Sequence, residues 1–350
     1  MAIALNDLQV DAALGVVADP GIADGDKIDM LVEIAMGLQT RPKSPADLAS
    51  AIRLYDHALS LCASDADLPR ARITARKGTA WQSMPGETVD GLEAARDCYE
   101  AALPAMRSRG LPEELAELEM NHGLVLQSLA GFGRARVTDA IAAYHRALRV
   151  FGRTEHPKEF AILQNNLATA FISIPLSDER AKMREALAVQ AFEEGLRAVN
   201  LIDHPSEYAM LQNNLGNALQ YASSSHAVEN NLRALDAYDE ALKVRNRAAT
   251  PLEFANTAAN KANCLWNLPD QPDRPELGNP RNLAAALELL REAAEIFHAH
   301  GETGKAAQVA EAMVAIRAEI EAGEDAAHGP RPGDNGSGGN GSGGNGHARN

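Results

Sequence analysis

The stretch Pro205-Ser-Glu-Tyr-Ala-Met-Leu-Gln-Asn-Asn-Leu-Gly-Asn-Ala-Leu219 decides the fold, because its pattern recurs along the chain. A proline is followed two residues later by a glutamate, then by an apolar residue and an alanine, and nine residues after the proline by an asparagine. Four copies begin at Pro112, Pro157, Pro205 and Pro251, at spacings of 45, 48 and 46 residues. A fixed period of this size predicts a stacked-repeat architecture.

Each copy of this motif has the composition of a helix N-terminus. Proline suits the first helical position, where its missing N–H would have no partner in any case. The glutamate lies in the first turn, where its charge meets the positive end of the helix dipole. In the third copy an apolar stripe continues through Tyr208, Leu211, Leu215 and Ala218, in steps of three and four residues. We name this helix A of each repeat.

A second helix, helix B, is expected after each helix A. It carries an aromatic residue or leucine, followed three residues later by alanine or glycine. The six copies are Tyr55/Ala58, Tyr99/Ala102, Tyr144/Ala147, Phe192/Gly195, Tyr238/Ala241 and Leu290/Ala293. Because helix B occurs six times, helix A is extended to two earlier copies near residues 27–39 and 69–84.

The ends of the chain differ from the repeats. A last helix at about residues 303–322 is expected to cap the stack. Its apolar side would hold Ala307, Val309, Ala310 and Met313. Residues 323–350 are rich in glycine, asparagine and serine and predict a disordered tail. Residues 1–26 form an N-terminal segment with room for a short helix. The proline-rich segment 269–280 is expected to be a loop.

Composition restricts the partners and the compartment. A formal net charge of −15 and a pI near 5.1 argue against nucleic-acid binding and against an anionic membrane surface. No run of about 18 apolar residues predicts a transmembrane helix. The N-terminus lacks a basic region, and Asp7 and Asp11 interrupt its apolar residues, so no signal peptide is expected. The cytoplasm is the simplest location.

Nothing in the sequence predicts catalysis, a metal or a cofactor. Cys62, Cys98 and Cys264 are far apart and fit buried small side chains better than disulfides. His298 and His300 are two residues apart on a helix, so they point to different faces. No glycine-rich phosphate loop follows a strand, and the histidines lack partners at zinc spacing. We therefore expect a protein that is not an enzyme.

The repeats resemble the tetratricopeptide repeat (TPR) family. The resemblance rests on Asn-Leu-Gly-Asn-Ala-Leu at 214–219 and on the aromatic-x-x-Ala pattern of helix B. The period is longer than the family's usual length of about 34 residues. It is similar to that of kinesin light chains and of bacterial arrays with Gln-Asn-Asn-Leu, found here at 164–167 and 212–215. The resemblance implies an all-α, right-handed α-solenoid of about six TPR-like hairpins, which together with the capping helix spans residues 27–322.

The resemblance also implies a binding surface, because helix A lines the concave groove in this family and contacts an extended peptide. Carboxamides both donate and accept hydrogen bonds, so a row of them could pair with a peptide backbone. The alternative is that each asparagine bonds to a neighbouring helix and stitches repeats together. The candidate groove residues are Arg76, Asn121, Gln127, Asn165, Asn166, Thr169, Asn213, Asn214, Asn217, Gln220, Asn260, Asn263 and Trp266.

Only Arg76 supplies a positive charge at these positions, so recognition of an acidic C-terminal motif is not expected. The sequence favours a non-catalytic interaction module, that is, an adaptor, scaffold or assembly factor with a protein or peptide partner. Two alternatives stay open. One is a regulatory sensor that binds a small peptide or metabolite in the groove, and the other is an accessory subunit of an enzyme complex.

Overall fold

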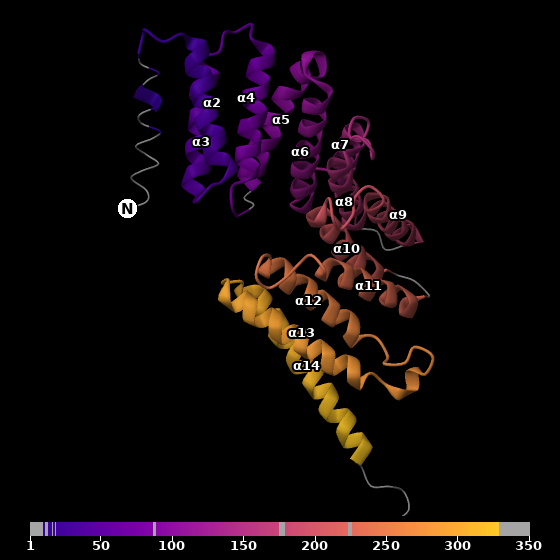
Figure 1. The fold of residues 1–350 in the computed structure, drawn as a ribbon. Helices are drawn as coiled ribbons and strands as arrows, with labels where there is room; N and C mark the ends of the chain where they lie inside the picture. The colour runs from indigo at the N-terminus through magenta and orange to yellow at the C-terminus, as the bar shows by residue number, and fades with distance from the viewer. Residues whose placement is uncertain are drawn as a thin grey trace, which may run out of the picture.

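The structure, a computed structural model, describes residues 19–86, 89–174, 179–222 and 226–328, together with residues 10, 13–15 and 17. Within these ranges the regular secondary structure is entirely helical. The helices follow one another as hairpins that stack into an arc open to one side (Figure 1). The fold is therefore an α-solenoid, as predicted.

Each predicted hairpin is present in the described ranges. Helices A are α2 (Asp24–Thr40), α4 (Asp67–Gln82), α6 (Pro112–Gly131), α8 (Pro157–Ser173), α10 (Pro205–Gln220) and α12 (Pro251–Trp266). Helices B are α3 (Pro45–Leu61), α5 (Val89–Arg109), α7 (Val137–Ala147), α9 (Glu179–Leu196), α11 (Ala227–Leu242) and α13 (Pro280–Ala299). A short 3-10 turn, η1 (Pro275–Leu277), lies in the proline-rich loop, and α14 (Thr303–His328) follows α13.

The packed side of the capping helix α14 overlaps with the predicted one, because Val309 is buried and Met313 packs against the same cluster. Ala306, Val309 and Ile316 are buried against α12 and α13, whereas Ala307 and Ala310 are exposed. The expectation for these two alanines was wrong, because alanine is common on both faces of this helix and did not fix its register. The packed stripe starts at Ala306, one residue before the predicted Ala307. It continues in steps of three, four and three residues to Val309, Met313 and Ile316.

The chain ends are described only in part. Helix α14 continues to His328, beyond the expected end at residue 322. The rest of the expected tail, residues 329–350, lies outside the described residues. In the N-terminal segment Val10 and Ala13 are buried against the first hairpin, and residues 1–9 lie outside the described residues.

In four of the six hairpins a large buried tyrosine holds the two helices together and brings them close. Tyr144 and Tyr238 are fully buried between helices A and B. A Cβ added to Gly123 would lie 2.5 Å from the Tyr144 ring, and one added to Gly216 would lie 2.6 Å from the Tyr238 ring. Glycine is needed at these two positions because interiors are close-packed and leave no room for a methyl group there.

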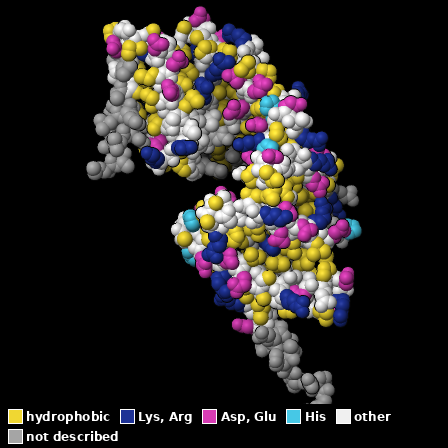
Figure 2. Space-filling model, in the orientation of Figure 1, with side chains coloured by type: hydrophobic (Ala, Val, Ile, Leu, Met, Phe, Trp, Pro, Cys, Tyr) yellow, Lys and Arg dark blue, Asp and Glu magenta, His cyan; other side chains and the backbone are white. Residues whose placement is uncertain are grey.

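Helix A lines the inside of the arc. Helices A of successive hairpins contact one another directly, from α2 with α4 to α10 with α12. Figure 1 places α6, α8, α10 and α12 on the inner side and α7, α9, α11 and α13 outside. Figure 2 shows the notch enclosed by the arc, and it shows acidic and basic side chains interspersed over the visible face. None of the described helices combines the length and apolarity that a bilayer crossing requires.

Candidate functional site

Five asparagines from three inner helices form a continuous chain of amides. Asn260 Nδ2 donates to Asn213 Oδ1 at 3.2 Å, and Asn213 Nδ2 donates to Asn214 Oδ1 at 3.0 Å. Asn214 Nδ2 then donates to Asn165 Oδ1 at 2.7 Å, and Asn165 Nδ2 donates to Asn166 Oδ1 at 3.4 Å. Every donor points the same way, from α12 through α10 to α8. This arrangement favours stitching of repeats over contact with a ligand for these five residues.

Burial supports the same interpretation. Asn165, Asn166 and Asn213 are 8%, 6% and 7% exposed, so their amides have little surface to offer. The chain of amides stops at Asn166, whose Nδ2 is buried without a hydrogen-bond partner. The repeat spacing of 45 residues places Met120 where the next acceptor would be, and a thioether is a weak acceptor.

A second repeated contact joins the two helices within a hairpin, from a tyrosine hydroxyl of helix B to a glutamine of helix A. The pairs are Tyr55 with Gln39 at 2.8 Å, Tyr99 with Gln82 at 2.6 Å, Tyr144 with Gln127 at 2.8 Å, and Tyr238 with Gln220 at 2.8 Å. Asn217 Oδ1 also accepts from the Tyr238 hydroxyl, at 2.8 Å. Burial raises the pKa of Tyr55 to about 12, so these hydroxyls stay protonated donors.

The fourth hairpin breaks this pattern in both partners at once. Phe192 replaces the tyrosine, and Ile172 replaces the glutamine. Phe192 is buried, whereas Ile172 is 49% exposed. The hydroxyl and its acceptor are therefore lost together, as expected if each exists for the other.

Two other candidate residues also have internal partners. Gln127 Nε2 donates to Thr169 Oγ1 at 3.1 Å, and the Thr169 hydroxyl donates to the Asn166 carbonyl at 3.0 Å. Trp266 Nε1 donates to Glu319 Oε2 of α14 at 2.7 Å and so fastens the capping helix.

Three candidate residues keep unused polar groups. The side chains of Arg76, Asn121 and Asn263 make no hydrogen bond or ion pair within the described part of the chain. Arg76 is exceptional among the described cations of helices A, because each of the others has a partner. Those contacts are Lys27 with Asp24, Arg70 with the Leu59 and Cys62 carbonyls, Arg72 with Glu114, Lys77 with Asp56, Lys158 with Glu207, and Lys261 with Asp239.

These three residues line two separate hollows. The first, of about 130 Å³, lies between α4 and α6 and includes Arg76, Glu117 and Asn121 in its wall. The second, of about 220 Å³, lies between α12 and α14 and includes Asn263 and Lys305. Helix A positions thus open into hollows near both ends of the arc.

A third hollow lies between these ends. It has a volume of about 390 Å³ and is lined by Ile172, Asn217 and Tyr221. Tyr221 is 68% exposed, so this part of the surface is apolar and accessible. The loss of the glutamine in the fourth hairpin is the reason for its apolar character.

Sequence reasoning missed some residues of these hollows. Glu117 could have been found, because it lies one helical turn before Asn121 on the same face. Lys305 and Gln308 of α14 could not, since they lie outside the repeated helices and no ladder of equivalent positions includes them.

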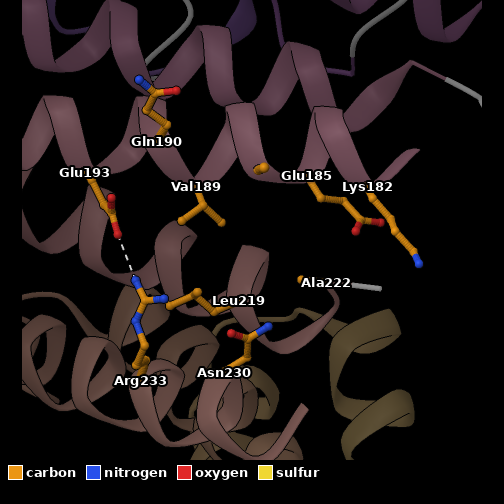
Figure 3. Close-up of a pocket in the computed structure, with 10 residues that line it drawn as sticks. Lys182, Glu185, Val189, Gln190, Glu193, Leu219, Ala222, Asn230 and Arg233 are labelled. Carbon is orange, nitrogen blue, oxygen red and sulfur yellow. Dashed lines mark hydrogen bonds and ion pairs between the residues drawn. The ribbon is translucent and has the colours of Figure 1, made fainter. Parts of the chain in front are cut away.

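Another hollow, of about 510 Å³, lies between the outer helices α9 and α11 (Figure 3). Val189 and Leu219 give it apolar walls. Glu193 and Arg233 face each other at one end in an ion pair of 2.7 Å, and Lys182 lies at the other end. None of the candidate groove residues lines this hollow.

The described residues contain no group of three or more histidine, cysteine, aspartate or glutamate side chains placed to hold a metal ion. Cys62 and Cys264 are buried. Burial raises the pKa of the Cys264 thiol to about 12, which keeps it protonated and unreactive.

No protein-family model and no curated protein matches this chain. Among solved structures, the chain is similar to a Rap protein complexed with Competence and Sporulation Factor. The two share 13% identity at a TM-score of 0.40, over 89% of this chain and 80% of the Rap chain. The fold is established by the helices of this chain itself, which follow one another as stacked hairpins in a helical repeat.

Proposed function

We propose that this protein is a non-catalytic interaction module that binds a peptide or a protein segment along the inside of its arc. It would act as an adaptor, a scaffold or an assembly factor. The observation that supports this most is that Arg76, Asn121 and Asn263 keep unused polar groups and line hollows on the inner helices.

The chemistry of the inner surface suits an extended segment. Such a segment carries one carbonyl and one N–H per residue, which carboxamides such as those of Asn121 and Asn263 can satisfy. The guanidinium of Arg76 offers several donors in a fixed plane, and Glu114, which lines the same hollow, forms its ion pair with Arg72 instead. The apolar hollow at Ile172 and Tyr221 could hold a bulky side chain between the two polar ends.

Site-specific photo-crosslinking tests this proposal. A photoreactive residue would replace Asn121, Asn263 or, as the matched control, Asp236, which is exposed on the outer helix α11. We expect the first two positions to capture the same polypeptide from native extract and the control to capture none of it. A synthetic peptide of the captured sequence should bind the protein and should lose affinity for the Arg76→Ala/Asn263→Ala variant. Capture from Asp236 alone would contradict the proposal.

The identity of the captured polypeptide distinguishes an accessory subunit from an adaptor or scaffold. An enzyme subunit captured in equal amounts would point to an accessory subunit, which would use the same inner surface. An unrelated protein segment would point to an adaptor or scaffold.

A sensor of a small ligand is a second candidate, supported by the hollow between α9 and α11. Its volume of about 510 Å³ falls in the range usual for small-molecule sites, about 300–1,000 Å³. Leu219→Trp would fill it with an indole. We expect a small molecule retained in native mass spectra of the protein to disappear in this variant if the sensor proposal holds.

A further inference from the structure

Neighbouring hairpins are joined by a repeated ion pair. In two cases a lysine of helix A meets an aspartate that directly follows the buried tyrosine in helix B of the preceding hairpin. Lys77 Nζ lies 2.6 Å from Asp56 Oδ1, and Lys261 contacts Asp239 in the same way. We call this contact between helix B of one hairpin and helix A of the next an inter-hairpin joint.

Histidine takes the place of lysine in the joint between α5 and α6. His122 follows Asn121 as Lys77 follows Arg76 and as Lys261 follows Asn260. Its partner, Glu100, directly follows Tyr99. His122 Nε2 lies 3.6 Å from Glu100 Oε1, which is longer than a hydrogen bond. The joint therefore occupies the same position between hairpins as the lysine joints but holds, without a direct hydrogen bond, a group whose charge changes near neutral pH.

The surroundings of His122 favour its neutral form. The residue is 6% exposed, and neither ring nitrogen has a hydrogen-bond partner. The Tyr99 ring of α5 packs against it edge-on, with 6.3 Å between the ring centroids. Burial lowers the pKa of His122, and the positive charge of Arg146 in α7 acts in the same direction. Glu100 of α5 and Glu119 of α6 act in the opposite direction without outweighing burial.

The buried carboxylate of Glu119 already balances the charges of two arginines. Both oxygens of Glu119 are already in use: Oε1 accepts from Arg107 of α5 at 2.9 Å, and Oε2 accepts from Arg146 of α7 at 2.8 Å. Glu100 is more than half exposed and too distant for a hydrogen bond. A protonated His122 would be buried with its Nδ1–H unsatisfied among the described residues, and its Nε2–H would face Glu100 Oε1 at 3.6 Å, beyond hydrogen-bond length, until that side chain or the helices move.

We propose that the joint between α5 and α6 is proton-sensitive: neutral His122 keeps it closed, and protonation of His122 loosens α6 from α5. The two lysine joints contain no histidine and serve as references within the same protein. The open joint binds a proton more readily than the closed one, so acidification below the ordinary histidine pKa of about 6.5 favours opening. At higher pH the joint is fully stabilised.

Hydrogen–deuterium exchange of the full chain tests this proposal, with rates corrected for the intrinsic effect of pH. Between about pH 7.5 and about pH 5.5, we expect protection of α5 and α6 to fall at least about threefold more in the wild type than in His122→Leu. Leucine is the matched replacement, because Leu167 and Leu215 occupy this position in α8 and α10. Protection of α12, next to the Lys261 joint, should not change.

Two results would overturn the proposal. One is an equal loss of protection in the wild type and in His122→Leu, and the other is a gain of protection on acidification. If His122→Leu does not fold, a proton NMR titration of wild-type His122 decides the matter. A midpoint below 6.5 supports the proposal, and a midpoint at or above 6.5 refutes it, since the closed joint would then prefer the charged ring.

Discussion

Asn214 of α10 donates a hydrogen bond from its Nδ2 to Oδ1 of Asn165 in α8, at 2.7 Å and across 49 positions of sequence. Without this bond the Asn214 Nδ2 donor and the Asn165 Oδ1 acceptor would each lose a partner, so the pair makes one repeat depend on the next. The same asparagines that suggest a ligand surface in the sequence therefore bond to one another between α8, α10 and α12, and three of them are buried.

The chain of amides gives a stability prediction. We expect Asn213→Ala to lower the free energy of unfolding by about 1–3 kcal/mol, because Asn260 and Asn214 each lose a partner in a largely buried place. Asn263→Ala, one helical turn after Asn260 in α12, should change the free energy of unfolding by less than about 0.5 kcal/mol. Urea unfolding followed by circular dichroism measures both. Equal losses would mean that Asn263 has a structural role too.

The end of the amide chain can be extended. Met120→Asn should give the orphan Nδ2 of Asn166 an oxygen acceptor and stabilise the protein by about 0.5–1.5 kcal/mol. Met120→Leu keeps an apolar side chain of similar size and is the control. Thermal unfolding should show a higher Tm for the asparagine variant than for the leucine variant. The reverse order would show that Asn166 does not point to this position.

The fourth hairpin allows the tyrosine–glutamine pair to be rebuilt. Phe192→Tyr alone should destabilise the protein by about 1–3 kcal/mol, since its hydroxyl would be buried beside Ile172 without an acceptor. Adding Ile172→Gln should recover this loss. The double-mutant cycle should give a favourable coupling of about 0.5–3 kcal/mol. Additive effects of the two changes would contradict the pairing rule inferred from the other hairpins.

Glu119 gives a pH-dependent prediction. Burial works to raise the pKa of this carboxyl, but hydrogen bonds from Arg146 and Arg107 outweigh it and hold the pKa below its usual range. Its stabilising effect is thus present above the ordinary glutamate pKa and is lost as pH falls through the lowered one. We expect Glu119→Gln to cost about 1–3 kcal/mol near neutral pH and progressively less in acid. Unfolding curves at a series of pH values measure the difference in unfolding free energy between the wild type and Glu119→Gln. A difference that does not change with pH would contradict the lowered pKa of Glu119.

The hairpins could be predicted because their signals are local. A proline, a glutamate and a stripe of apolar residues fix where each helix A begins, as at Pro112 and Pro251, and the buried tyrosine fixes the face of helix B. The use of the polar residues could not be predicted in the same way. Whether Asn217 faces a ligand or a tyrosine depends on the distance between two neighbouring helices. Helical periodicity predicts the face of one helix but not its distance from the next.

Some of the missing information was nevertheless in the sequence. Glutamine and tyrosine occur together in four hairpins and are lost together at Ile172 and Phe192, which identifies them as partners once both ladders are compared. The same comparison across hairpins aligns His122 with Lys77 and Glu100 with Asp56. By contrast, the register of α14 had no repeated copy to calibrate it, and its alanine-rich faces gave conflicting patterns.

The one-way run of amides also bears on mechanics. From α8 to α12 the side-chain amides connect each repeat to the next by hydrogen bonds. Toward the N-terminus the run of amides stops at Met120. The joint between α5 and α6, one hairpin further on, holds a histidine. Pulled from its ends, such a stack should not yield evenly along its length. It should give first between the third and fourth hairpins, where the amide run ends at Asn166, while the C-terminal half moves as one stiff block.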